Sequence, residues 1–202
     1  MKFYKLENSH TGRIAELHIQ GISTGFISSL GIDFVTALYE AIAQSKFSFG
    51  FVAEENNKIL GFVAFATNIN KLYKSVILKE GWRFAFLSAG KMFSLRRMKK
   101  VLQTLFYASR IKKKMDLPSA ELLSIVVAEQ AQGKGIGKQL LERGFRECAK
   151  RDVDKVKVLV GANNEPAIKL YLKFGFELAG QFDNHGILSN IYVASTCTKE
   201  GQ

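Results

Sequence analysis

The chain is 202 residues long, 47% hydrophobic and contains two prolines, which fits one folded domain spanning residues 1–202 and argues against a disordered protein. Its formal net charge is +11, and nine basic residues with no acidic one fall between Lys91 and Lys114. We expect no membrane span, because no uncharged apolar run reaches about 18 residues, and no signal peptide. Cys148 and Cys197 are too few for a disulfide framework or zinc motif, so we expect a reducing, cytoplasmic setting.

In chain order, the first third of the sequence alternates between strand and helix patterns. Alternation of apolar and polar residues predicts strands, whereas apolar residues three and four apart predict helices. These patterns predict, in order, a strand at 2–6, a helix over 8–22, a loop over 23–31, a helix over 32–45, and two strands within 47–68 around the turn Glu55–Asn57.

The rest of the chain begins with a long basic, aromatic-rich segment, Asn70–Pro118, predicted to be helical in pieces. After it we predict a buried strand at 120–127, a glycine loop and a helix to about Arg151, a strand at 153–161, a helix over 163–175, and a closing hairpin of 176–182 and 187–195. This order indicates an α/β fold with a mixed central sheet flanked by helices, and a helical insertion at about 70–118 between strands 3 and 4.

The stretch EQAQGKGIGKQLLERG, Glu129–Gly144, places a glycine-rich loop directly before a helix. It is not a dinucleotide fingerprint, because the third glycine would fall at Lys138 or Leu140. It is not a Walker A loop either, because Gln132 and Gln139 stand where glycine and Ser or Thr are needed.

An anion site is still the chemistry that this loop favours. Glycines let backbone N–H groups approach a ligand closely, and the start of a helix carries a partial positive charge. Lys134 and Lys138 add full charges at the rim, so a pyrophosphate is a suitable ligand. The alternative is a glycine-rich turn that binds nothing.

Two blocks of residues resemble the GNAT-type (Gcn5-related) N-acetyltransferase family. The first is VVAEQAQGKGIGKQLL, with Gln132, Gly135 and Gly137 at the spacing of the family's acetyl-coenzyme A signature. The second, downstream in the same order, is VGANNEPAIKLYLKFGFELAG, which carries Asn164, Ala167, Tyr171 and Gly175–Phe176. Two ordered blocks are more specific than either one alone.

The resemblance implies a mostly antiparallel central sheet and acetyl-CoA as cosubstrate, with no metal ion. Backbone groups of one strand would pair with the pantetheine arm, and loop N–H groups would hold the pyrophosphate. Asn164 would contact the pantetheine or cap its helix. The implied cofactor-binding residues are Ile125, Val126, Val127, Gln132, Gly133, Lys134, Gly135, Ile136, Gly137, Lys138 and Asn164.

The resemblance also implies catalytic roles. The thioester would lie between the strands at 121–127 and 155–160, which splay apart in this family, with an N–H group near Val127 stabilising the oxyanion. Tyr171 would protonate the leaving thiolate; its alternative is a core aromatic side chain. Glu121 would accept the amine's proton; its alternative is a solvent-facing carboxylate at a strand end. His18 falls on the acceptor side, although a helix-surface histidine is the commoner explanation.

The basic insertion has three interpretations. It is an extra helical layer with exposed cations, a basic surface for an anionic membrane, or a docking patch for an acidic partner such as a carrier protein. Specific nucleic-acid binding is not expected, because no recognition motif accompanies the charge.

The leading hypothesis is an N-acetyltransferase in which a primary amine attacks the thioester of acetyl-CoA directly. The acceptor would be a small-molecule amine, an amino sugar or a protein N-terminus. The alternatives are a non-catalytic coenzyme A-binding module and an acyltransferase acting on a membrane- or carrier-linked substrate. Self-association into a homodimer stays open.

Overall fold

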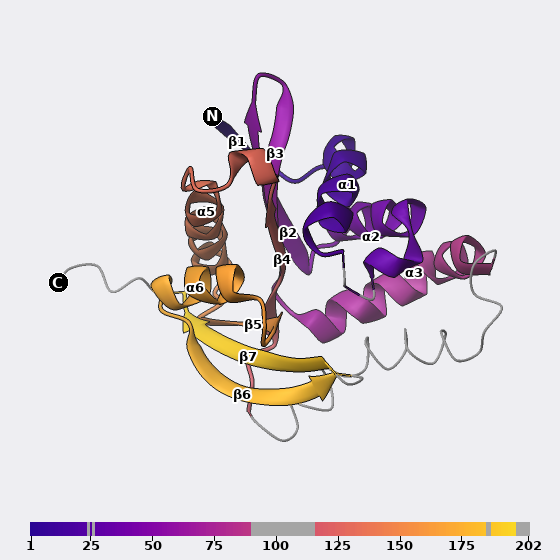
Figure 1. The fold of residues 1–202 in the computed structure, drawn as a ribbon. Coiled ribbons are helices and arrows are strands. Elements are labelled where there is room, and N and C mark those ends of the chain that lie inside the picture. Colours follow the sequence, from indigo (N-terminus) through magenta and orange to yellow (C-terminus); the bar gives the residue numbers. More distant parts are fainter. Residues whose placement is uncertain (24, 26, 90–115, 185–186, 197–202) are drawn as a thin grey trace.

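The computed structural model describes residues 1–23, 25, 27–89, 116–184 and 187–196. Its strands form a sheet in the order β1-β2-β3-β4-β5-β7-β6 (Figure 1). Their bounds are β1 Lys2–Lys5, β2 Ser48–Glu55, β3 Lys58–Ala66, β4 Ala120–Val127, β5 Lys155–Gly161, β6 Glu177–Asn184 and β7 Ile187–Ser195. Of the neighbouring pairs, β4 and β5 run parallel and the others antiparallel, which confirms the mixed, mostly antiparallel sheet.

Helices cover both faces of the sheet. In Figure 1, α5 and α6 lie on one side of it, and α1 and α2 lie on the other. Their bounds are α1 Thr11–Gly21, α2 Ile32–Gln44, α3 Ile69–Ala89, α5 Ile136–Lys150 and α6 Glu165–Lys173. The helix α5 makes the crossover that two parallel neighbouring strands require, because a tight turn cannot join them.

The β2–β3 hairpin turns where the sequence predicts it. Asn56 and Asn57 have φ angles of 50° and 58°, in the left-handed region that asparagine tolerates well. Two successive left-handed residues give a turn whose twist matches that of the flanking strands.

The insertion between β3 and β4 begins as the long helix α3. Asn68 starts it, since its Oδ1 accepts a hydrogen bond from the N–H of Lys71 at 3.0 Å. The N–H of Ile69 donates to the carbonyl of Ser119 at 2.9 Å, so the start of α3 lies beside the start of β4. The basic cluster Lys91–Lys114 lies outside the described residues.

The α5 face of the sheet packs closely. Gly144 allows this approach, because a Cβ atom there would lie 2.2 Å from the ring of Phe65. Phe65 stacks on Phe49 at a centroid distance of 5.2 Å. Cys148 is buried in the same core, and burial raises the pKa of its thiol to about 12. Within the described ranges, no helix is long and apolar enough to span a membrane.

Candidate functional site

A gap opens in the sheet between β4 and β5. The two strands pair only over Ala120–Leu122, although β4 continues to Val127. The N–H of Ala128 donates to the carbonyl of Leu60 on β3 at 2.7 Å. Because backbone groups alternate in direction along a strand, those of Ile125 and Val127 face the gap instead. This edge of β4 can therefore pair with an extended ligand.

A cavity of about 580 Å³ adjoins this edge and is bounded by the glycine loop, the start of α5 and the helix α6. Every predicted cofactor-binding residue lines it except Lys134. The sequence analysis did not assign the rest of the wall to the site, namely Gly21, Ala131, Pro166, Ala167, Leu170, Lys173 and Phe174. Of these, Pro166, Ala167, Leu170, Lys173 and Phe174 stand in the second sequence block, so they could have been inferred from the helical spacing around Ala167.

The glycine loop directs backbone amides toward the cavity. Gly133 and Gly135 have φ angles of 77° and 74°, a left-handed conformation that is costly for residues with a Cβ atom. Gly135 is the N-cap of α5 and has no side chain to accept hydrogen bonds from the first turn. The first N–H groups of α5 therefore have no side-chain cap, which is the arrangement that binds anions at helix starts.

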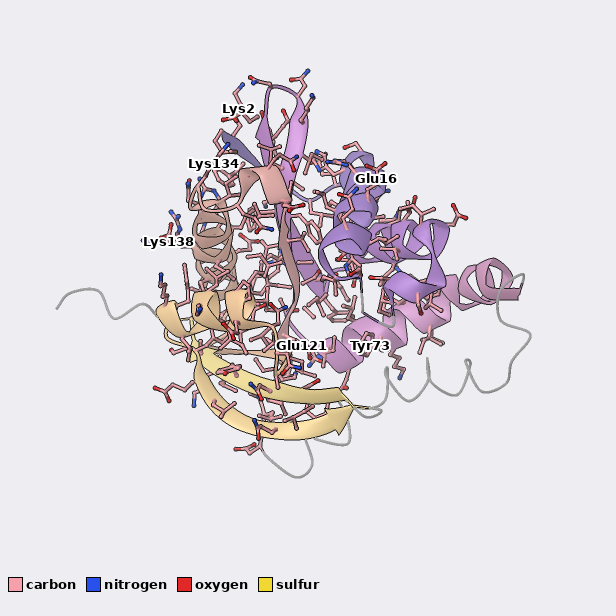
Figure 2. The ribbon with its side chains drawn as sticks, in the orientation of Figure 1. Lys2, Glu16, Tyr73, Glu121, Lys134 and Lys138 are labelled. Carbon is pink, nitrogen blue, oxygen red and sulfur yellow. The ribbon has the colours of Figure 1, made fainter. Side chains whose placement is uncertain are left out.

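Polar side chains hold and flank this loop. Gln132 donates from Nε2 to the carbonyl of Val127 at 3.1 Å and so joins the loop to the end of β4. Lys138 is 68% exposed and lies 3.8 Å from a carboxylate oxygen of Glu142. In Figure 2, Lys134 and Lys138 lie on the side of α5 that faces away from the sheet. Of the two, only Lys138 lines the cavity.

Asn164 caps α6 and lies on the cavity wall. Its Oδ1 accepts a hydrogen bond from the N–H of Ala167 at 3.3 Å. Pro166 stands in the first turn of α6, and Gly175 follows its end with a φ of 74°, both as the sequence predicts.

Tyr171 lies in the core next to this cavity. It is 5% exposed, and its ring is 5.4 Å from that of Phe176. Leu170 and Phe174 of the same helix line the cavity, whereas Tyr171 does not. Burial raises the pKa of the phenol, which therefore keeps its proton at neutral pH.

Glu121 is buried, so the interpretation as a solvent-facing carboxylate is wrong. Its Oε2 lies 3.1 Å from Nζ of Lys157, its register partner on β5. Lys157 also donates to the carbonyl of Pro118 at 2.8 Å. Burial raises the pKa of the Glu121 carboxyl, and the charge of Lys157 opposes that rise. The protonation state of this carboxyl therefore depends on the balance between burial and the charge of Lys157.

His18 is also buried, at 7% exposure, so the helix-surface interpretation is wrong. Its Nδ1 lies 2.7 Å from the hydroxyl of Tyr39, which lies 2.7 Å from Oγ of Ser124. Burial lowers the pKa of His18 to about 4, so the ring is neutral at pH 7. This polar chain joins α1, α2 and β4 on the sheet face opposite α5. Ser124, a polar residue between apolar neighbours in the β4 strand pattern, was the one signal of it in the sequence.

No group of three or more His, Cys, Asp or Glu side chains in the described ranges is arranged to hold a metal ion. The described site contains the unpaired edge of β4, the start of α5 without a side-chain cap, and the buried ionisable side chains Glu121 and Tyr171.

The chain belongs to the acetyltransferase (GNAT) family, whose model matches residues 25–176. This confirms the resemblance seen in the two sequence blocks. Curated relatives include a mycothiol acetyltransferase of Corynebacterium aurimucosum, 37% identical over 65 residues, which are 32% of this chain and 21% of that protein. Another is the spermine/spermidine N(1)-acetyltransferase of Bacillus subtilis, 34% identical over 61 residues, 30% of this chain and 40% of that protein. The matches thus span less than half of these relatives.

Solved structures share the whole fold. The ribosomal-protein-S18-alanine N-acetyltransferase of Escherichia coli superposes with a TM-score of 0.61 at 16% identity, over 100% of this chain and 98% of that one. NAA60 of Arabidopsis thaliana, solved in complex with acetyl-CoA, superposes with a TM-score of 0.58 at 16% sequence identity. The superposition covers 96% of this chain and 97% of that one. At these identities the likeness establishes the fold.

Proposed function

We propose that this protein is an acetyl-CoA-dependent N-acetyltransferase that acts on a primary amine. The observation that carries the proposal is the cavity that runs from the uncapped start of α5 along the unpaired edge of β4. It combines an anion site at one end with a strand edge for an extended amide-containing chain, which are the two features of a coenzyme A tail.

In this proposal, the pyrophosphate lies against the backbone of the loop from Gln132 to Lys138. The pantetheine arm pairs with Ile125 and Val127, whose backbone groups have no β5 partner. Gln132 supports this arrangement, because its side chain fixes the loop to the end of β4. The acetyl thioester then points toward the closed end of the gap, where an N–H group of β4 stabilises the oxyanion.

The reaction needs a neutral amine and a leaving group that becomes protonated. Glu121 accepts the proton of the ammonium, directly or through water, and the freed nitrogen lone pair attacks the thioester carbon. The carbon–sulfur bond breaks, and the coenzyme A thiolate takes a proton from Tyr171. The second proton of the attacking nitrogen passes through water to the phenolate and restores Tyr171, while Glu121 releases its proton to solvent. Burial makes this phenol a weaker acid by raising its pKa, so the assignment rests on the position of Tyr171 on α6, beside Leu170 and Phe174 of the cavity wall.

The acceptor class is a small-molecule amine, an amino sugar or a protein N-terminus. The names of similar proteins support both a small-molecule and a protein acceptor, since they include spermine/spermidine N(1)-acetyltransferase and ribosomal-protein-S18-alanine N-acetyltransferase. A membrane- or carrier-linked acceptor, a homodimer and a cytoplasmic setting remain predictions from the sequence.

Calorimetry with acetyl-CoA followed by a thiol-release assay over a panel of amines tests the proposal. We expect binding in the micromolar range and coenzyme A release that depends on one class of amine. Binding without release on any amine would favour a non-catalytic coenzyme A-binding module. Absence of binding at millimolar acetyl-CoA would refute both.

A further inference from the structure

A buried ion pair lies where β4 and β5 separate. Glu121 and Lys157 are register partners on the two strands, and only one further pair follows before the gap opens. Their side chains are 11% and 4% exposed. Two opposite charges are rarely buried so deeply without a role, because taking charges out of water is costly.

We propose that Lys157 is a positioning residue that keeps Glu121 ionised as the proton acceptor for the attacking amine. This inference rests on the proposed function, and it adds a residue on β5 to a site otherwise built from β4, the glycine loop and α6.

The geometry fixes the cation beside the carboxylate. Lys157 is anchored by its hydrogen bond to the carbonyl of Pro118 at 2.8 Å. Its Nζ is 3.1 Å from Oε2 of Glu121, an oxygen that is buried in the protein. The charge of Lys157 and its hydrogen bond to the carboxyl both favour the ionised form of Glu121.

Two elements present titratable groups to Glu121. Lys157 faces it from β5, and Tyr73 faces it from the insertion helix α3, as Figure 2 shows. The negative charge of Glu121 adds to burial in raising the pKa of the Tyr73 phenol, so that phenol stays neutral and adds no charge. Among the described residues, Lys157 is thus the charge that acts on Glu121.

Two opposing causes set the pKa of Glu121, and they give the direction in which it shifts when Lys157 is lost. Burial raises the pKa of Glu121, which makes its carboxylate a stronger base, and Lys157 lowers that pKa. Without Lys157, the carboxyl would hold its proton to higher pH and could not take one from the ammonium.

The test is the pH dependence of kcat/KM in thiol release with an amine identified by the panel. In Lys157→Met, we expect the acid limb to move to higher pH by about 1 to 3 units, the usual effect of losing a close opposite charge. Lys155→Met, an exposed lysine two residues earlier on the same strand, is the matched control and should keep the wild-type limb. An unchanged acid limb in Lys157→Met, even with lower activity, would reduce Lys157 to a structural residue and overturn the proposal.

A second measurement does not depend on the variant folding. In the wild-type protein, the side-chain carboxyl carbon of Glu121 can be titrated by NMR, with Glu121→Gln used to assign the signal. We expect its midpoint above 4.5 and coincident with the acid limb of kcat/KM. A midpoint that differs from the acid limb overturns the proposal, whereas loss of acetyl-CoA binding in the wild type would refute the proposed function itself.

Discussion

The two ends of the gap between β4 and β5 differ in the groups that they present, which are backbone groups at one end and side chains at the other. The open end uses backbone: glycines with left-handed φ angles, the first amides of α5 and the unpaired edge of β4. The closed end uses side chains: Glu121 and Lys157 are paired below the surface, and Ser124 of β4 is joined to Tyr39 of α2 and His18 of α1. Backbone recognition suits a ligand that never varies, whereas side chains can be adjusted to the reaction.

Introducing a carboxylate at the open end should have the largest effect. In Gly135→Asp, a negative side chain replaces the N-cap glycine at the anion site, and its φ of 74° adds strain. Gly137→Asp would place a carboxylate on the cavity wall, where a Cβ atom at this position would lie 3.4 Å from the side chain of Leu170. We expect both to abolish acetyl-CoA binding by calorimetry. Gly12→Asp, in an exposed position with no atom within 4 Å of its Cβ, is the control. If Gly135→Asp still binds acetyl-CoA, the backbone at the start of α5 is not the site that holds the phosphates.

Removing the hydroxyl of Tyr171 should affect turnover and leave cofactor binding intact. The side chain does not line the cavity, so acetyl-CoA affinity should hold in Tyr171→Phe. We expect turnover to fall by about 100-fold, the lower range for loss of a general acid. Steady-state kinetics and calorimetry on the same preparation measure both. If Tyr171→Phe turns over at the wild-type rate, Tyr171 only packs beside Phe176 and is not the general acid.

Breaking the buried polar chain should cost stability. Tyr39→Phe removes the hydroxyl between His18 and Ser124 and keeps the ring packed at 5.2 Å from Phe62. Two buried polar atoms lose their partner, so we expect a loss of about 1–3 kcal/mol in the free energy of unfolding by urea. Tyr4→Phe, on β1 at 40% exposure, serves as the reference. If the two variants are equally stable, the hydrogen bonds among His18, Tyr39 and Ser124 do not stabilise the packing of α1 and α2 on β4.

The smallest effect should distinguish the two lysines of the loop. Lys138 lines the cavity and Lys134 does not. We expect Lys138→Ala to weaken acetyl-CoA binding a few-fold at low salt, since the side chain is exposed and its charge is screened. Lys134→Ala should change the affinity less. The reverse order would show that the rim charges, rather than the cavity wall, attract the phosphates.

The sequence predicted the open end almost completely, because its recognition is local. Glycine spacing, the strand before it and the helix after it lie within one continuous stretch, and periodicity finds such elements well. The order of elements along the chain followed from the same alternation, and the mixed, mostly antiparallel sheet followed from the family resemblance.

The closed end was harder to predict, because its contacts join distant parts of the chain. Lys157 stands in an alternating strand, KVKVLV, where a lysine is normally a solvent-facing residue. Only the register with β4 shows that it meets Glu121. His18 was misjudged for the same reason, since its helical position does not reveal that α2 covers it.

The burial of Cys148 has a practical consequence for enzymology. A thiol with a pKa near 12 in a closed core reacts slowly with Ellman's reagent, because the thiolate is the reactive form. Released coenzyme A can therefore be followed continuously by colour, with little background from Cys148. A Cys197→Ser variant removes the other cysteine, so that absorbance at the end of a progress curve counts product alone.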